Sequence, residues 1–203
     1  MSEPYLGGPP GPGRRHWIEY VATFVGLIVA VISLWVAIAT EKANQKMVNA
    51  NYRMVAAASW PYLQVDSGNE DAGAHRITME LQNAGVGPAK IQSFEIFWRG
   101  KAYPSSFALL KACCAPTATL IKMGTLPVLG MVLRAGDQRQ FLRLDLDPDD
   151  PRIWKTFDEV RQRELSYRAC YCSVFDECWI SQLNASTPQR VKACPKPATP
   201  FNH

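Results

Sequence analysis

The sequence predicts a mainly β domain that follows one membrane-spanning helix. Residues 20–40 form 21 uncharged, mostly apolar positions. From residue 60 onward, short runs of alternating apolar and polar residues are separated by turns that contain glycine and proline. At 203 residues, the chain has room for one domain of common size and one additional segment.

The composition is that of a folded protein without a nucleic-acid partner. Charged residues make up 20% of the chain and hydrophobic residues 47%, both ordinary values for a globular protein. The net charge of +4 is modest, and the basic residues are scattered. Nucleic-acid-binding proteins usually concentrate them on one face or one helix.

The apolar segment is long enough to cross a bilayer, which needs about 20 helical residues. Trp17 and Tyr20 stand at one edge, where interfacial aromatic residues are enriched. A secretory signal fits less well, because the run is too long and no small-residue cleavage site follows promptly. A buried helix of a soluble protein is the other alternative. We predict a flexible Pro/Gly-rich tail over 1–16 and a transmembrane helix over 17–40.

The helix is expected to continue as a stalk over 41–59, because Pro61 disfavours helix in the residue before it. An uncharged seam of mainly small residues recurs along it at alternating spacings of four and three, as in a heptad repeat. Small residues let helices approach closely in a bilayer, so we expect a homo-oligomer or a partner membrane protein at this seam. The alternative is a chance stripe in an Ala/Val-rich anchor. The seam consists of Ala22, Gly26, Val29, Ser33, Val36, Thr40, Ala43, Met47, Ala50, Met54 and Ala57.

The charges that flank the span do not decide its orientation. Arg14 and Arg15 precede it, and Lys42, Lys46 and Arg53 follow it. All six cysteines lie after the span, which suits an oxidising compartment. Long domains also cross membranes largely regardless of their charge. We therefore expect the C-terminal domain outside the cytoplasm.

The first strands are predicted from residue alternation. "WPYLQV" is expected to be a strand, and in "ITMELQN" apolar residues alternate with polar ones, which is typical of a strand with one buried face. "NAGVGPA" then supplies a turn. In "KIQSFEIFWRG", Ile91 is out of phase with the later apolar residues, so we expect a β-bulge near Gln92 or Ser93.

A short helix is predicted over 105–114, a connecting loop over 117–130, and strand, turn and strand in "MVLRAGDQRQFLRLDL". Asp149-Asp150-Pro151 is a good helix start; this helix should run to about Glu164 and bury Ile153, Phe157 and Val160. "LSYRACYCSVF" and "CWISQL" predict a final hairpin, followed by a Pro-rich tail over 195–203. Together, the short strands and two short helices predict an immunoglobulin-like β-sandwich over 60–194, with a mixed α+β domain as the alternative.

The even number of cysteines favours structural disulfides, although the sequence does not choose the pairs. On a strand, Cys170 and Cys172 point to the same face, so they are better placed to bond separate partners than each other. A two-residue turn at Asp176-Glu177 would put Cys178 opposite Phe175 and make a direct bridge within the hairpin unfavourable. This leaves Cys113, Cys114 and Cys194 as candidate partners for the hairpin cysteines. The disulfide candidates are Cys113, Cys114, Cys170, Cys172, Cys178 and Cys194.

Three other states of the cysteines remain open. A metal site could use Cys170, Cys172 and Cys178 with Cys194 or Cys114, but paired Cys-x2–4-Cys spacings and nearby histidines are missing. A redox site would favour Cys-x-x-Cys at a helix start, and the vicinal Cys113-Cys114 is equally explained by buried thiols or by two separate bridges. Plain buried thiols are the third alternative. We expect no metal and no cofactor.

Two further segments were candidates for sites. "DSGNEDAGAH" holds Asp66, Glu70, Asp71 and His75, which could coordinate a cation, but its composition favours a solvated loop. "NAS" at 184–186 is a glycosylation sequon, relevant only in a eukaryotic secretory pathway. No nucleophile, phosphate-binding or zinc-protease motif occurs, so we expect no enzyme.

"SWPYLQV" after a stalk, "LQNAGVGPAKI" and "CYCSVFDECW" together resemble uncharacterised bacterial proteins with one membrane span and a small exported domain. The Asn-x-Gly-x-Gly-Pro-Ala turn is similar to one in immunoglobulin-like adhesion and scaffolding domains. The resemblance implies a single-pass protein of the bacterial inner membrane with a periplasmic C-terminal domain, and no catalytic residues. We expect a non-catalytic binding or accessory protein, such as a subunit of a larger membrane or envelope complex. The alternative is a membrane-anchored thiol redox or metal-handling protein.

Overall fold

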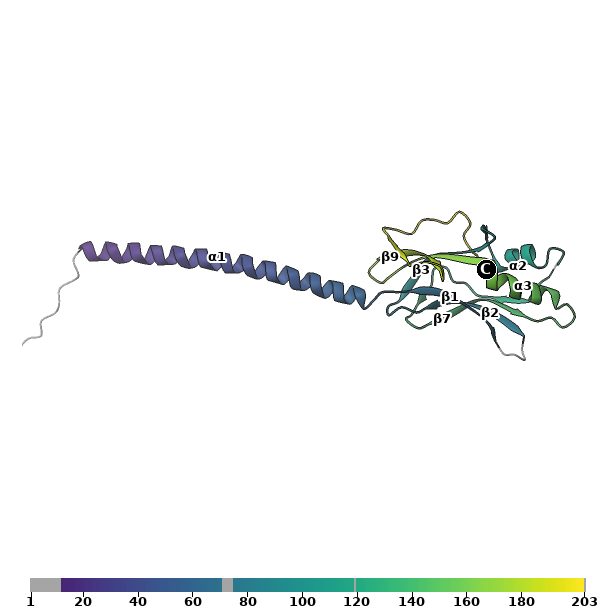
Figure 1. The fold of residues 1–203 in the computed structure, drawn as a ribbon. Coiled ribbons are helices and arrows are strands. Elements are labelled where there is room, and N and C mark those ends of the chain that lie inside the picture. The colour runs from purple at the N-terminus through teal and green to yellow at the C-terminus, as the bar shows by residue number, and fades with distance from the viewer. Residues whose placement is uncertain (1–11, 71–74, 119, 203) are drawn as a thin grey trace, which may run out of the picture. The chain divides into compact units, whose positions relative to one another are not determined.

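The computed structural model describes residues 12–70, 75–118 and 120–202, and the chain divides into two units between Met54 and Val55 (Figure 1). Helix α1 (Pro12–Ala57) contains all the described residues of the first unit. It begins inside the segment predicted as a tail, whose residues 1–11 lie outside the described part. The helix continues without interruption beyond residue 40, which confirms the predicted helical extension.

Helix α1 is long and apolar enough to cross a membrane. Within Trp17–Ala57, the most apolar stretch has a mean hydropathy of 2.6. Its large apolar side chains, such as Phe24, Leu34 and Trp35, are exposed. An apolar helix that buries nothing in its own chain is a candidate membrane span rather than a core helix.

The described residues of the second unit form two antiparallel sheets and two short helices. This confirms a β-rich domain after a long apolar helix. Helices α2 and α3 contact each other and lie at one end of the domain (Figure 1). One sheet has the order β1 (Leu63–Glu70), β2 (Arg76–Asn83), β7 (Gln138–Asp145), β5 (Met123–Thr125). The other has the order β10 (Gln189–Val191), β9 (Cys178–Leu183), β8 (Leu165–Cys172), β3 (Ala89–Trp98), β4 (Lys101–Tyr103), and β6 (Val132–Leu133) also pairs with β3. The helices are α2 (Ser106–Cys113) and α3 (Arg152–Arg163).

Strands β1 and β2 form a hairpin whose register runs from the pair Leu63–Asn83 to the pair Glu70–Arg76. The predicted first strand therefore starts later and runs further than "WPYLQV", because its polar half pairs along the whole of β2. In β2 the predicted apolar residues Ile77, Met79 and Leu81 are fully buried, and Thr78 on the opposite face is buried as well.

Strand β3 contains the predicted bulge. Its pairing with β8 shifts between Ile91 and Ser93, so Gln92 has no partner in that register and is exposed. The extra residue brings Ile91 into phase with Phe94, and both side chains are buried in the core.

The segment predicted as strand, turn and strand does not form a hairpin. Strand β6 pairs with β3, whereas β7 pairs with β2, so the chain passes from one sheet to the other through the turn at Gly136. Gly136 has a φ of 80°, which suits glycine, and its N–H donates to the carbonyl of Asn83 at 2.8 Å. The predicted connecting loop over 117–130 also contains a short strand, β5.

Helix α3 starts one residue after Pro151, close to the predicted position. The Asp150 carboxylate accepts a hydrogen bond from the backbone N–H of Arg152 at 3.3 Å. The helix buries Phe157 and Val160, as predicted, and leaves Ile153 half-buried.

Aromatic rings join the two sheets. Phe94 of β3 lies 5.1 Å from Phe141 of β7, measured between ring centroids, and Phe141 lies 6.5 Å from Tyr167 of β8. Phe201, from the segment predicted as a Pro-rich tail, is only 2% exposed and lies 5.5 Å from Phe94. Its backbone N–H donates to the carbonyl of Phe94 at 3.3 Å. The C-terminal segment therefore contributes to the core between the sheets.

The "NAGVGPA" turn is organised by the buried side chain of Asn83. Its amide nitrogen donates to the carbonyls of Gly87 at 2.8 Å and Leu133 at 3.1 Å. Its amide oxygen accepts from the backbone N–H groups of Tyr62 and Gly85 at 3.2 and 3.1 Å. One side chain thus fixes the turn, the entry to β1 and the end of β6.

Candidate functional site: a four-cysteine cluster on the last hairpin

Strands β8 and β9 bring three cysteines together at one end of their hairpin. Cys172 lies directly opposite Cys178 in the register, and these two form a disulfide. Cys170, two residues earlier on β8, forms a disulfide with Cys194 instead. The prediction that Cys170 and Cys172 bond separate partners is confirmed.

The prediction that the hairpin carries no internal bridge is wrong. It assumed a two-residue turn at Asp176-Glu177, whereas the strands are joined by five residues, Ser173–Glu177. The loop is closed by the N–H of Ser173, which donates to the carbonyl of Glu177 at 2.8 Å. With five residues in the loop, Cys178 lies opposite Cys172 in the register instead of opposite Phe175.

The loop is also tied to its surroundings by charges. Lys90 at the start of β3 forms an ion pair with Asp176, which has a positive φ of 59°. Glu177 forms a second ion pair with Arg190 of β10. These contacts hold the loop next to the cysteines, and they connect it to strands β3 and β10 of the same sheet.

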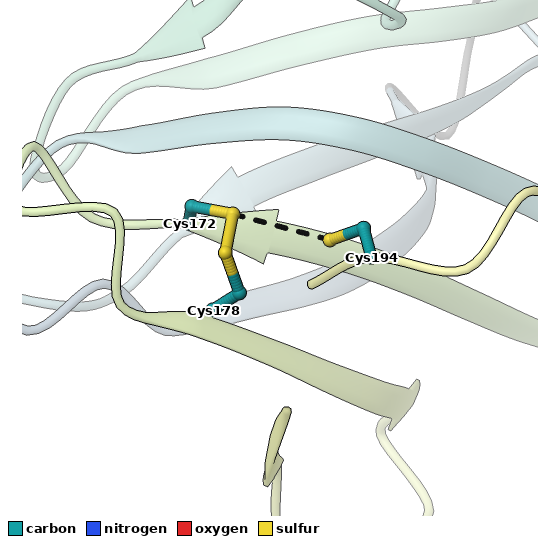
Figure 2. Close-up of side chains that lie close together, drawn as sticks. All are labelled: Cys172, Cys178 and Cys194. Carbon is teal, nitrogen blue, oxygen red and sulfur yellow. Dashed lines mark hydrogen bonds between the residues drawn. A yellow bond between two sulfur atoms is a disulfide. The ribbon is translucent and has the colours of Figure 1, made fainter. Parts of the chain in front are cut away.

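The two disulfides approach each other closely through Cys172 and Cys194. Figure 2 shows a dashed line between their Sγ atoms, which are 3.9 Å apart. Because both sulfurs are already bonded in disulfides, neither carries a hydrogen to donate, so the contact is the close approach of two disulfides. The Sγ atoms of Cys172, Cys178 and Cys194 all lie within 4.8 Å of one another.

The four cysteines differ in their access to solvent. Cys170 is 0% exposed, Cys172 5% and Cys178 6%, whereas Cys194 is half-buried. Cys194 is therefore the most exposed residue of the four. Three sulfurs at this spacing could also bind a soft metal as thiolates, but only after both disulfides are reduced.

The remaining cysteines, Cys113 and Cys114, form a disulfide with each other at the end of α2. The interpretations as two separate bridges or as buried thiols are both wrong. Neither residue is a partner for the hairpin cysteines, contrary to expectation. Both are half-buried and pack against the edge of the core.

Among the described residues, the other predicted segments take part in strand β1 or in its contacts. Asp66 and the backbone of Glu70 belong to strand β1 and not to a solvated loop, while Asp71 lies outside the described residues. In the sequon, the Asn184 side chain donates to the carbonyl of Val65 and accepts from its N–H at 3.1 Å. It therefore pairs with the backbone of β1 as a neighbouring strand would.

A pocket of about 200 Å³, which was not predicted from the sequence, lies between β7, α3 and the segment before β5. Its rim carries Asp145, Asp147 and Asp150, and the "DLDPDD" run was the available signal. A hydrogen bond from Arg76 holds the pKa of Asp145 below its usual value, and the backbone N–H of Asp149 does the same for the pKa of Asp147. Because each of the three carboxylates is paired with a basic side chain, the rim is already neutralised.

The seam residues all lie on the uninterrupted helix α1. Those with large side chains are exposed in the single chain, among them Val29, Val36, Met47 and Met54. The seam therefore has no partner within the described part of this chain.

No curated protein and no solved structure matches this chain. A family described as a domain of unknown function, DUF8453, matches residues 18–130. The match runs from α1 through β1–β4 and α2 to β5, and it ends before the strands that carry the four-cysteine cluster. Since it covers more than half of the sequence, the chain belongs to the DUF8453 family.

Proposed function

We propose that this protein is a membrane-anchored, non-catalytic accessory protein that displays a disulfide-stapled β domain to a binding partner. The observation that carries the proposal is helix α1, which is long enough to span a bilayer and continues past the apolar stretch as an exposed helical stalk. The family match supports it, because one family includes both the helix and the first half of the β domain. This supports a single functional unit made of both parts.

We also propose that the domain is immunoglobulin-like. Immunoglobulin constant domains have strands A-B-E-D in one sheet and C-F-G in the other. Reading β1, β2, β3, β5, β7, β8 and β9 as A, B, C, D, E, F and G reproduces both orders. Strand β4 then continues the C-F-G sheet beyond C, and β10 continues it beyond G. This agreement of order in both sheets supports the fold assignment.

The proposed location is the bacterial inner membrane, with the β domain in the periplasm. The pairing of all six cysteines supports an oxidising compartment, because disulfides persist there and are rare in the cytosol. The test is to alkylate intact cells before lysis and to map unreduced peptides by mass spectrometry. The proposal expects the pairs 113–114, 170–194 and 172–178; free thiols at these positions would place the domain in the cytoplasm.

The partner proposed for the helix is a second copy of the chain. A 4–3 repeat of uncharged, mainly small residues is the pattern by which identical helices pack in parallel. The test is disulfide crosslinking in native membranes of single cysteines in the seam, at Ala43, Ala50 and Ala57, with Asn44 and Asn51 as controls off the seam. Dimers from seam positions alone support the proposal. Equal crosslinking at the control positions, or an adduct with a different membrane protein, contradicts the homodimer.

The second candidate function is thiol-based metal handling. The observation in its favour is the group of three sulfurs within 4.8 Å of one another. It predicts that the fully reduced protein binds one soft metal ion, measured by titration with Cu(I) or Zn²⁺ and by metal analysis after desalting. A Cys194→Ser variant should then bind more weakly than a variant with serine at Cys113 and Cys114. Equal binding by both variants would exclude this cluster as the metal site.

A further inference from the structure

Two disulfides in this domain are close enough to exchange partners. The bonds Cys172–Cys178 and Cys170–Cys194 are separate covalent links, yet the Cys172 and Cys194 sulfurs lie 3.9 Å apart (Figure 2). Thiol–disulfide exchange needs a thiolate that reaches a sulfur of an intact disulfide. Opening either bond creates such a thiolate beside the other bond.

We propose that these four cysteines form a thiol–disulfide exchange site that accepts one electron pair from a dithiol. The pair is stored as thiols on Cys170 and Cys178, and a new disulfide links Cys172 to Cys194. This activity does not depend on the proposed binding function, because it follows from the geometry of the hairpin alone.

The first route begins at Cys194, the most exposed residue of the four. A thiolate of the dithiol attacks Cys194, the bond to Cys170 breaks, and Cys170 leaves as a thiolate that takes a proton from solvent. The second thiol of the reductant then resolves the mixed disulfide, which releases the Cys194 thiolate and the cyclised or oxidised reductant. The Cys194 thiolate attacks Cys172, their bond forms, and Cys178 leaves as a thiolate that is protonated.

The second route begins at the hairpin disulfide and leads to the same product. The dithiol attacks Cys178, Cys172 leaves as a thiolate, and the reductant's second thiol frees Cys178. The Cys172 thiolate then attacks Cys194, and Cys170 leaves. In both routes the dithiol loses two electrons and the protein gains two, with two thiols in place of one disulfide. The convergence follows from the 3.9 Å distance between the Cys172 and Cys194 sulfurs.

The product keeps the C-terminal segment attached to strand β8. Cys194 moves its bond from Cys170 to Cys172, which is two residues further along the same strand. Phe201 and its contacts in the core remain tethered on the same side. Exchange thus transfers electrons through the cluster without releasing the strand or the segment that follows β10.

The experiment uses the full-length protein in detergent micelles and dithiothreitol as the probe. The protein is treated with increasing amounts of dithiothreitol, quenched with acid, and alkylated with N-ethylmaleimide in denaturant at mildly acidic pH, so that buried thiols are labelled before they can exchange. Chymotrypsin cleavage after Tyr171 and Phe175 separates Cys170, Cys172 and Cys178, and trypsin cleavage after Lys192 isolates the peptide with Cys194. Unreduced peptides are then identified by mass spectrometry.

The expected result is a dominant species with labels on Cys170 and Cys178 and a crosslinked peptide that joins Cys172 to Cys194. Labels on Cys172 and Cys178 with Cys170–Cys194 intact would overturn the proposal. So would labels on Cys170 and Cys194 with the hairpin bond intact, or no labelling of the cluster before the domain unfolds. A variant with serine at Cys113 and Cys114 serves as the control, because the reductant is then consumed at the cluster alone.

A second variant tests the exchange step without any reductant. In Cys178→Ser, Cys172 has no partner within the hairpin. Its thiolate should therefore form a disulfide with Cys194 and release Cys170, which then carries the label. A label that stays on Cys172 in the folded variant would contradict the proposal. The matched variant Cys113→Ser should leave its single label on Cys114 and all four cluster sulfurs unlabelled.

Discussion

Arg168 and Glu95 face each other on strands β8 and β3 and form a two-pronged ion pair. The guanidinium Nε donates to Glu95 Oε2 at 2.7 Å, and Nη2 donates to Oε1 at 3.0 Å. The Glu95 side chain is 5% exposed and that of Arg168 41%. The pKa of Arg168 is raised, mainly by the hydrogen bond to Glu95. The pair therefore holds a carboxylate that is nearly out of solvent.

Removing Arg168 alone should lower the free energy of unfolding more than removing both partners. Arg168→Ala leaves the buried carboxylate of Glu95 unpaired and is expected to lower the free energy of unfolding by about 2–4 kcal/mol, since the cation is half-exposed. The double variant with Glu95→Gln and Arg168→Met should lose less, because no buried charge remains. Thermal and urea unfolding of the full chain in detergent measures both. An equal or larger loss in the double variant would contradict this account.

The glycines of the "NAGVGPA" turn are required by the close approach of the chain at residues 59–62. A Cβ on Gly87 would lie 2.1 Å from the carbonyl oxygen of Ser59, and one on Gly85 would lie 2.3 Å from the backbone nitrogen of Tyr62. Gly87→Ala should therefore displace the backbone and cost about 3 kcal/mol or more. Gly68→Ala is the control, because its Cβ would meet nothing within 4 Å. Similar melting temperatures for both variants would contradict the prediction.

Phe201 should be a stability residue although it follows the last strand. Its ring contacts Phe94 and Phe141, with centroids 5.5 and 6.3 Å away, so Phe201→Ala opens a cavity between the sheets. The expected loss is about 3–5 kcal/mol. Lys196→Ala, an exposed position in the same segment, should change the stability by less than about 0.5 kcal/mol. Unfolding curves that coincide for Phe201→Ala and the parent chain would rule out this role.

The buried phenol of Tyr167 should make the domain labile to base. Burial raises the pKa of Tyr167, partly opposed by the charge of Arg161, and its hydroxyl has no hydrogen-bond partner among the described residues. The pKa of Tyr167 in the folded state lies above the unfolded value of about 10. The stability that the neutral phenol contributes is therefore fully present below pH 10 and is lost as the pH rises further. Tyr167→Phe should therefore unfold at higher pH, with unchanged or slightly greater stability at neutral pH.

The measurement is unfolding against pH, monitored by tyrosinate absorbance and circular dichroism. Some alkaline lability should remain in Tyr167→Phe, because burial also raises the pKa of Tyr171, to about 12. An identical alkaline transition in the parent and in Tyr167→Phe would show that Tyr167 is not responsible.

Local patterns were sufficient for much of the β domain. The buried apolar residues of β2 and the phase change at Gln92 each depend on neighbouring residues, and both were predicted correctly. The buried position of Phe201 could not be predicted in this way. It depends on contacts with strands about 60 and 107 residues earlier, and a proline-rich stretch has no periodicity that reports such contacts.

The cysteine pairs show the same limit. The bonding of Cys170 and Cys172 to different partners follows from strand geometry, because residues two apart on a strand point to the same face. The bond between Cys172 and Cys178 depended on the length of the loop, and a loop of five residues has no strong local signal. The position of Cys194 is fixed by β10, a short strand of three residues that sequence analysis did not predict.

The place of Phe201 in the core also sets the order of events during synthesis. Chains emerge from the ribosome N-terminus first, at about 5–20 residues per second. Helix α1 is therefore complete long before the core residue at position 201 has been made. The β domain can therefore complete its core only after the chain has been translated as far as Phe201. If α1 enters the membrane when it emerges, the domain folds as a tethered chain and never as a free one.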